Sequence, residues 1–164
     1  MCGPGSGAYC ARAGALLCVF VLAGGCATHP AAPPRPGEPA AGQGSAIAVL
    51  AASLVGTPYH FGGADAAGFV CSGLALYVHQ RIGLTIPRTA AAQQRAALPV
   101  PLAELAPGDL VFFRIHAWRG IDHVGIYAGA GRFIHSPRPG QAVTYADLTR
   151  GFYARHVRGA GRFW

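Results

Sequence analysis

The sequence predicts an α+β domain in which helices precede a mainly antiparallel sheet. In the first half of the chain, apolar residues recur at the spacing of helices that bury one side. In the second half, short apolar runs are separated by turn residues, and two of them form a hairpin around Gly129-Ala130-Gly131. The chain has 164 residues, of which 52% are hydrophobic, so it is long enough for one domain with its own core.

Residues 1–26 are interpreted as a signal peptide with a lipoprotein-type processing site. Residues 13–23 form an apolar run after Arg12 that is too short to span a membrane comfortably. Small residues then lead to Cys26, a pattern that resembles the sites where bacterial lipoproteins are cleaved and lipidated. We therefore expect a lipid anchor at Cys26; an ordinary secretory signal, cleaved elsewhere, is the alternative. Because Ala27 and not Asp follows, we expect an outer-membrane location facing the periplasm.

Residues 27–45 are rich in proline, alanine and glycine and lack large apolar side chains, which is typical of a disordered tether. The folded domain is expected to occupy residues 46–164. The formal net charge of +7 fits an anionic surface such as a cell wall or lipid headgroups. A nucleic acid partner is disfavoured, because the sequence has no basic helix and no repeat of arginine with aromatic residues.

Three helices are expected in the first half of the domain. They cover residues 45–55, about 71–83 and 90–97. Ser45 is the candidate N-terminal cap of the first helix, and Gly56 marks its end. Thr57-Pro58-Tyr59 then predicts an extended segment, because a residue before proline avoids the helical region.

Strands dominate the second half. Residues 109–115 are expected to form a strand that is buried on both faces, because its apolar residues follow one another without alternation. Residues 122–128 and 132–135 are the two strands of the hairpin. A last strand is predicted within residues 152–158.

Cys71 is the candidate nucleophile. Leu74, Val78 and Ile82 follow it at helical spacing, which places Cys71 in the first turn of a buried helix. The positive end of a helix dipole and its free N–H groups favour the thiolate, the nucleophilic form of cysteine. The structural alternative is a small buried apolar residue. If the signal peptide is removed and Cys26 is lipidated, Cys71 is the only thiol left in an oxidising compartment, which favours a chemical use.

Two histidines flank the hairpin turn. With a three-residue Gly129-Ala130-Gly131 loop, Gly125 faces His135 and His123 is the diagonal neighbour of His135, so both imidazoles project from one face of the sheet. A two-residue loop would place them on opposite faces unless a bulge intervened. The alternative is two histidines with unrelated structural roles.

Seven short motifs occur in one order along the chain. They are Thr57-Pro58-Tyr59, Gly62-Gly63, Gly68-Phe69 with Cys71-Ser72-Gly73-Leu74, Pro87-Arg88-Thr89, Pro107-Gly108-Asp109-Leu110-Val111-Phe112-Phe113, His123-Val124-Gly125-Ile126-Tyr127 and Phe133-Ile134-His135. Over about residues 46–164 the ordered set resembles the NlpC-type family of bacterial cell-wall cysteine peptidases. The resemblance implies a minimal papain-like fold, with N-terminal helices packed on the sheet.

The resemblance also implies the roles of the site residues. Cys71 would be the nucleophile, His123 the general base and His135 the group that orients the base. Tyr59 would help to bind the reacting carbonyl, and a backbone N–H near the helix start, with Ser72 as the candidate, could stabilise the oxyanion. The implied substrate is the peptide stem of peptidoglycan, typically at the bond between D-glutamate and a diamino acid. We expect a monomer that needs no cofactor.

One residue departs from the family pattern. The family usually has Asp before the nucleophile, whereas this chain has Val70, which cannot cap the helix. Loss of the carboxylate does not oppose ionisation of Cys71, so substrate binding is the property that Val70 brings into question. Asp122 either replaces the missing carboxylate or caps a turn, and we favour the turn.

Three functional hypotheses follow. The first is an active peptidoglycan endopeptidase. The second is a catalytically inactive lipoprotein that binds peptidoglycan or regulates a hydrolase; Val70 favours it, whereas the joint presence of Cys71, His123 and His135 argues against it. The third is a metal site built from these three residues and Asp122, which lacks the close ligand pairs typical of zinc sites. Metal analysis would identify the third, and digestion of cell walls would separate the first two.

Overall fold

The computed structural model describes residues 42–164, so the predicted signal peptide, lipidation site and most of the predicted tether lie outside the described residues. The helices are α1 (Gln43–Ser53), α2 (Cys71–Arg81), α3 (Ala90–Ala96) and α4 (Gly151–His156), with one 3-10 turn at Leu102–Glu104. The strands are β1 (Ala64–Asp65), β2 (Gly68–Phe69), β3 (Leu98–Val100), β4 (Leu110–Phe113), β5 (His123–Gly129), β6 (Arg132–His135), β7 (Thr144–Asp147) and β8 (Val157–Arg162). Within this part of the chain, no helix combines the length and apolar character that a membrane crossing requires.

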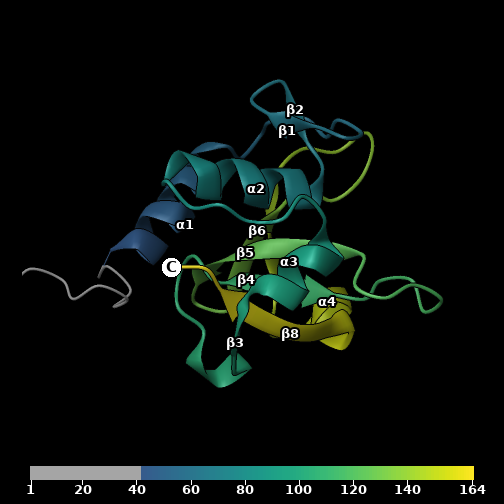
Figure 1. Cartoon of the computed structure of the whole chain (residues 1–164). Coiled ribbons are helices and arrows are strands. Elements are labelled where there is room, and N and C mark those ends of the chain that lie inside the picture. Colours follow the sequence, from purple (N-terminus) through teal and green to yellow (C-terminus); the bar gives the residue numbers. More distant parts are fainter. Residues whose placement is uncertain (1–41) are drawn as a thin grey trace, which may run out of the picture. The chain divides into compact units, whose positions relative to one another are not determined.

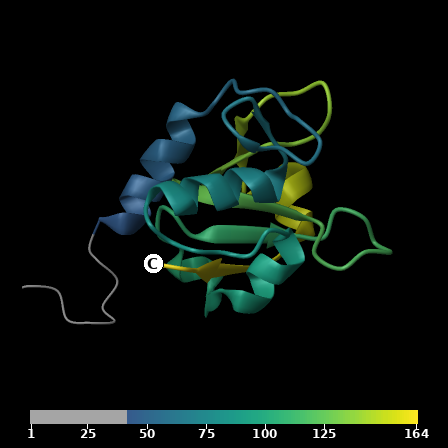
Figure 2. The same ribbon diagram turned by 45° about the horizontal axis from the view of Figure 1, so that its top comes forward.

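Six strands form one sheet in the order β3-β8-β4-β5-β6-β7, and every neighbouring pair is antiparallel. The two short strands β1 and β2 pair separately with each other. Helices α1 and α2 lie across one face of the large sheet (Figures 1 and 2). The predicted α+β class with a mainly antiparallel sheet is therefore confirmed.

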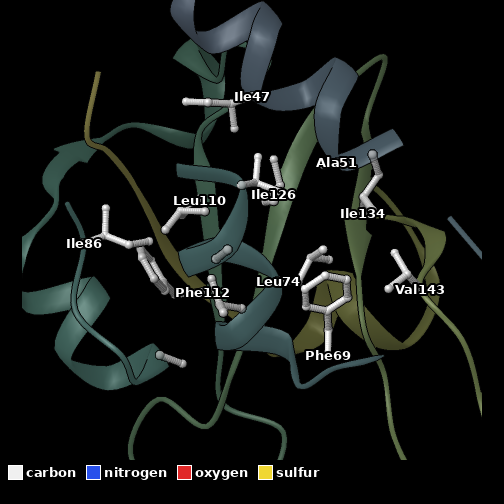
Figure 3. Close-up of a cluster of buried hydrophobic side chains, with 14 of the residues drawn as sticks. Ile47, Ala51, Phe69, Leu74, Ile86, Leu110, Phe112, Ile126, Ile134 and Val143 are labelled. Atoms are coloured by element: carbon white, nitrogen blue, oxygen red, sulfur yellow. The ribbon is translucent and has the colours of Figure 1, made fainter. Parts of the chain in front are cut away.

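Strand β4 is buried on both faces, as its uninterrupted apolar run predicts. Leu110 and Phe112 of β4 contribute to the larger core beneath α1 and α2, together with Ile126 and Ile134 of the hairpin (Figure 3). The alternate residues of β4 point to the other side. They form a second cluster with Phe133, against which Tyr153 of α4 packs. Each face of the central strands thus has its own apolar layer.

Two of the sequence expectations are wrong in detail. Helix α1 begins at Gln43, inside the predicted tether, and its N-cap is Gly42 and not Ser45. The start lies earlier because Gly44 packs against Pro107 and Trp164, a tertiary contact with no local sequence signal. Residues 152–156 are helical, and the last strand runs from Val157 to Arg162.

The last strand was predicted within residues 152–158, so most of it was missed, because small residues occupy its centre. An added Cβ at Gly161 would overlap Ala97, so this glycine permits the close packing of β8 beside the end of α3. The edge strands β3 and β7 and the short β1–β2 pair were also not anticipated. They are short, and their pairing depends on partners far away in the sequence.

A buried ion pair joins the start of β4 to the end of β8. The carboxylate of Asp109, which is fully buried, accepts hydrogen bonds from Arg162 Nε at 2.7 Å and Nη2 at 2.8 Å. The N–H of Ala106 donates to the same carboxylate at 2.8 Å. The guanidinium lies 4.4 Å from the ring centre of Trp164. The bidentate ion pair and the additional N–H donor together satisfy the buried negative charge of Asp109. They also hold the two strands together.

The start of α2 packs directly against the backbone of the loop before it. An added Cβ at Gly73 would overlap the carbonyl group of Gly63, and one at Gly63 would overlap the carbonyl of Gly68. The N–H of Val70 donates to the Gly63 oxygen at 3.0 Å. Only glycine allows this approach, which places the first turn of α2 close to the segment that precedes it.

We predict that Gly73→Ala lowers the free energy of unfolding by about 1–3 kcal/mol, the typical cost of forcing extra volume into a packed contact. Gly120→Ala is the control, because a Cβ at Gly120 meets no atom within 4 Å. The control should change stability by less than about 0.5 kcal/mol. Urea unfolding of both variants measures the difference, and equal stabilities would contradict the close approach of the two backbones.

Candidate active site

Cys71 is the first residue of α2, as predicted from the spacing of the apolar residues. Val70 occupies the N-cap position with extended backbone angles (φ −88°, ψ 166°), and its side chain makes no capping hydrogen bond. The backbone N–H groups of Cys71, Ser72 and Val124 favour a negative charge on the Cys71 sulfur. Two of these groups belong to the uncapped helix start, and the third comes from β5.

Burial nevertheless raises the pKa of the Cys71 thiol, and the negative charge of Asp122 acts in the same direction. The three N–H groups oppose this shift without cancelling it. The direction is opposite to the lowered pKa expected from the helix N-terminus alone. Here the free-energy cost of burying a thiolate exceeds the stabilisation that the helix N-terminus provides. The resting sulfur is therefore a thiol.

Both histidines of the hairpin lie on one face of the sheet, although the turn is not the expected three-residue loop. Its turn consists of Ala130 (φ 50°) and Gly131 (φ 70°), the positive angles of a two-residue hairpin turn. A bulge between Tyr127 and Gly129 restores the register, in which Ile126 lies opposite Ile134. Continuing this register places Gly125 opposite His135, as predicted. The bulge is therefore the feature that keeps the two imidazoles together.

His123 Nε2 and His135 Nδ1 lie 2.8 Å apart in a hydrogen bond, and both side chains are buried. The two rings are nearly perpendicular, at 89°. Burial lowers the pKa of His123 to about 4 and that of His135 to about 3, and the proximity of His123 contributes to the shift of His135. Both imidazoles are therefore neutral at pH 7. If His123 donates from Nε2, its Nδ1 is left unprotonated as a base.

Tyr153 belongs to the site, although sequence reasoning missed it. Its ring lies 4.9 Å from the ring of His135 in an edge-on arrangement and 6.1 Å from that of His123 in a nearly parallel one. Phe113 and Phe133 complete the aromatic surroundings of the pair. Residue 153 was assigned to a strand, and only the packing of α4 on the sheet brings its side chain here. These rings exclude water from the imidazoles, which is the physical cause of their low pKa values.

A cleft of about 630 Å³ opens over the thiol. Its lining brings together Tyr59, Cys71 and His123, as the sequence predicted, and adds their neighbours Val70 and Asp122 and residues from three other segments. The residues from these segments are Ile115, His116, Ser136, Pro137, Arg138, Gln141, Phe152 and Tyr153. His135 lies behind His123 and outside the lining, which suits a group that orients the base without touching substrate.

The side chain of Ser72 has a structural role. Its hydroxyl accepts a hydrogen bond from Arg88 Nη1 at 3.1 Å, and Arg88 Nη2 donates to the Gly62 oxygen at 2.8 Å. Gln93 Nε2 donates to the Ser72 carbonyl at 3.1 Å. Of the polar groups of Ser72, the backbone N–H is the one that favours a negative charge on the Cys71 sulfur, and the oxyanion role of this N–H stays a prediction. Arg88 of the Pro87-Arg88-Thr89 motif thus connects the start of α2 to the backbone of Gly62.

Asp122 stabilises a turn, which agrees with the favoured sequence interpretation. Its carboxylate accepts hydrogen bonds from the N–H groups of Ile115 at 2.7 Å and His116 at 2.9 Å, and it lies 2.7 Å from His116 Nδ1. Within residues 42–164, no group of three or more His, Cys, Asp or Glu side chains is arranged to hold a metal ion.

Comparisons with known proteins agree with this geometry. The sequence model of the NlpC/P60 family matches residues 56–162. The chain is 44% identical over 112 residues to the murein DD-endopeptidase MepH of Escherichia coli K12, covering 66% of this chain and 41% of that protein. It is 38% identical over 107 residues to a gamma-D-glutamyl-L-lysine dipeptidyl-peptidase of Bacillus subtilis 168, covering 65% and 36%. A solved NlpC/P60 family protein from Bacillus cereus ATCC 10987 superimposes with a TM-score of 0.69 at 33% identity, covering 73% and 40%. The chain spans less than half the length of these relatives.

We predict that alkylation of Cys71 by iodoacetamide accelerates with pH along a titration whose midpoint lies above the ordinary thiol value of about 8.5. The raised pKa keeps the sulfur protonated at neutral pH, and only the thiolate reacts. Mass spectrometry of the peptide that contains Cys71 measures the rate, and Cys71→Ser serves as the blank. A rate that already reaches its plateau below about pH 7 would reveal a resting thiolate–imidazolium pair and contradict the neutral state.

Proposed function

Because the chain belongs to the NlpC/P60 family, we propose that it is a cysteine endopeptidase that hydrolyses amide bonds in the stem peptides of peptidoglycan. The observation that carries the proposal is the hydrogen bond between His123 and His135 beside a cleft that also holds Cys71. A buried imidazole pair with one nitrogen left as a base has no evident structural purpose next to Cys71, the one free thiol among residues 42–164. The names of the relatives, a murein endopeptidase and a gamma-D-glutamyl-L-lysine peptidase, support the substrate class.

The first half of the reaction transfers the acyl group to sulfur. His123 Nδ1 takes the proton of the Cys71 thiol as the sulfur attacks the carbonyl carbon of the amide. The backbone N–H groups at the start of α2 and the hydroxyl of Tyr59 are the donors for the oxyanion. His123 then gives its proton to the leaving amine, and a thioester remains on Cys71.

The second half regenerates the enzyme. A water molecule enters the site, His123 removes its proton, and the resulting hydroxide attacks the thioester carbonyl. The sulfur leaves and recovers the proton from His123, and the acid product departs. His135 stays neutral throughout and accepts the hydrogen bond from His123 Nε2, which fixes the tautomer that both halves need.

The bond between D-glutamate and the diamino acid is our proposal for the cleavage site. The name of the Bacillus subtilis relative supports it, whereas MepH is named for a different bond, so the family fold accommodates more than one. Val70 is the feature that favours a catalytically inactive domain that binds peptidoglycan or regulates another hydrolase. Loss of a carboxylate at the N-cap leaves Cys71 and His123 intact, so we give preference to the enzyme.

We predict that Cys71→Ala abolishes turnover and that His123→Ala is nearly as severe, because a catalytic unit fails when either member is lost. His135→Ala should be milder and should lower kcat more than it raises KM, since this residue acts only through His123. Tyr59→Phe should also lower kcat. Release of peptides from isolated sacculi and from soluble stem peptides, followed by mass spectrometry, measures each effect.

His60→Ala is the control for these variants, because His60 is exposed and lies outside the cleft lining. Cleavage by Cys71→Ala at the rate of the wild type would overturn the proposed function. A wild type that binds sacculi and cleaves neither substrate would establish the inactive wall-binding protein in its place.

We also propose that the protein is anchored by lipid at Cys26 and faces the periplasm from the outer membrane. The apolar run of residues 13–23 and the small residues before Cys26 support this proposal, and both lie outside the described residues.

We predict that Cys26→Ser moves the protein from the membrane fraction to the soluble fraction, because the anchor attaches to that sulfur. The intact mass of the purified wild type should include the lipid. Unchanged retention in membranes and a wild-type mass without lipid would contradict the anchor.

A further inference from the structure

Residues 114–120, in the loop between β4 and β5, carry an exposed aromatic and basic surface that the proposed reaction does not use. We call these residues the rim loop; Figure 1 shows them extending outward beyond the ends of the two strands. Trp118 is 76% exposed. The guanidinium of Arg119 lies 4.3 Å from the centre of the Trp118 ring, so a cation covers one side of the indole. Arg114 adds a further positive charge at the start of the loop.

The base of the rim loop is tied to the active site. The carboxylate of Asp122, the residue before His123, binds the N–H groups of Ile115 and His116 and the ring of His116. The N–H of Arg119 donates to the carbonyl of His116 at 3.0 Å. An exposed tryptophan on a loop held by these hydrogen bonds presents a fixed surface to a partner, at little further cost in conformational entropy.

The same loop is continuous with the cleft. Ile115 and His116 line the cleft with Cys71, and the ring centre of His116 lies 5.9 Å from that of Trp118. A strip of rings and charge therefore runs from the cleft wall through His116 to Trp118 and Arg119. Consider a substrate whose scissile bond lies at Cys71. If its neighbouring group extends past His116, that group would contact the indole of Trp118.

The proposed substrate has such a group. The stem peptide is attached at its N-terminus to a sugar of the glycan strand, and the proposed bond follows the second residue. Two extended residues span about 7 Å, so the sugar lies at the cleft rim when the bond is at Cys71. An indole offers a flat apolar face to the C–H groups of a sugar ring, and neighbouring polar groups can bind its hydroxyl and carbonyl groups.

We propose that the rim loop is a glycan-binding surface, in which Trp118 packs on the sugar that carries the stem peptide and Arg119 and His116 flank it. The inference rests on the proposed peptidase function and extends it to the form of the substrate: the enzyme acts on stem peptides that are still attached to glycan in preference to free ones. A single exposed apolar side chain needs no explanation by itself. The continuity with the cleft and the fixed base of the loop distinguish Trp118 from such a residue.

The test compares two substrates that differ only in the sugar. One is the tetrapeptide N-acetyl-L-alanyl-γ-D-glutamyl-diaminopimelyl-D-alanine, whose acetyl group removes the charge of the free amine, and the other is the same tetrapeptide joined through its N-terminal amide to N-acetylglucosaminyl-N-acetylmuramic acid. The measured quantity is the ratio of kcat/KM for the glycosylated peptide to kcat/KM for the free peptide. We expect the wild-type ratio to exceed one and Trp118→Ala to lower it about two- to tenfold, the range expected for loss of one aromatic contact.

Two variants accompany Trp118→Ala. Trp118→Phe keeps an aromatic face and should restore part of the ratio. Leu98→Ala removes an exposed apolar side chain (69% exposed) from β3, at the edge of the sheet, and should leave the ratio unchanged. A binding measurement without turnover uses Cys71→Ser, in which the glycosylated peptide should change the tryptophan fluorescence and the free peptide should not. Because Trp164 also emits, the change is assigned to Trp118 by its loss when Trp118→Phe is combined with Cys71→Ser.

An unchanged ratio in Trp118→Ala, with both substrates still cleaved, overturns the glycan surface and leaves the peptidase in place. Binding of Trp118 to anionic vesicles, with an unchanged ratio, also overturns it and identifies a membrane contact. Cleavage of neither substrate overturns the proposed function, and the inference about the rim loop then fails with it. A lowered ratio that Trp118→Phe partly restores supports the inference.

Discussion

The close approach of two backbone segments at Gly63 and Gly73 is the constraint on which the site depends. It brings the start of α2 against the loop that precedes it, and the N–H of Val70 then bonds to the Gly63 oxygen at 3.0 Å. The end of that loop is fixed to the opposite wall of the cleft, because the hydroxyl of Ser136 donates to the Phe69 carbonyl at 2.6 Å. Cys71 therefore has its position set by backbone contacts on both sides, and no adjustment of its own side chain is required to reach the cleft.

Burial then determines the charge state of the groups that meet there. The same packing that holds Cys71 and His123 in place removes water from both, which raises the pKa of the thiol and lowers that of the imidazole. A thiolate–imidazolium pair is disfavoured at rest, so in the proposed reaction the proton transfer accompanies attack of the sulfur on the carbonyl carbon. His135 fits this scheme because a neutral acceptor can orient His123 without adding a charge that the aromatic rings around it could not solvate.

Local patterns predicted the parts of the site that depend on neighbours in sequence. Apolar spacing placed Cys71 at a helix start, and strand alternation placed His123 and His135 on one face. The contribution of Tyr153 was missed because its position depends on α4 packing across the sheet. The direction of the Cys71 pKa was wrong for the same reason. A helix end is visible in the sequence, whereas the desolvation that outweighs it comes from residues far away in the chain.

Val70 leaves the start of α2 without a capping side chain, and this affects the backbone N–H groups around Cys71. A carboxylate at the N-cap would satisfy N–H groups at the start of α2, and its absence costs the helix about 0.5–2 kcal/mol. Those N–H groups are therefore not engaged by a capping side chain, and two of them favour negative charge on the Cys71 sulfur. The other nearby carboxylate, Asp122, is committed to the rim loop. The helix start is therefore less stable than a capped one, and its donors stay available for the negative charge that the proposed reaction develops, first on sulfur and then on the carbonyl oxygen.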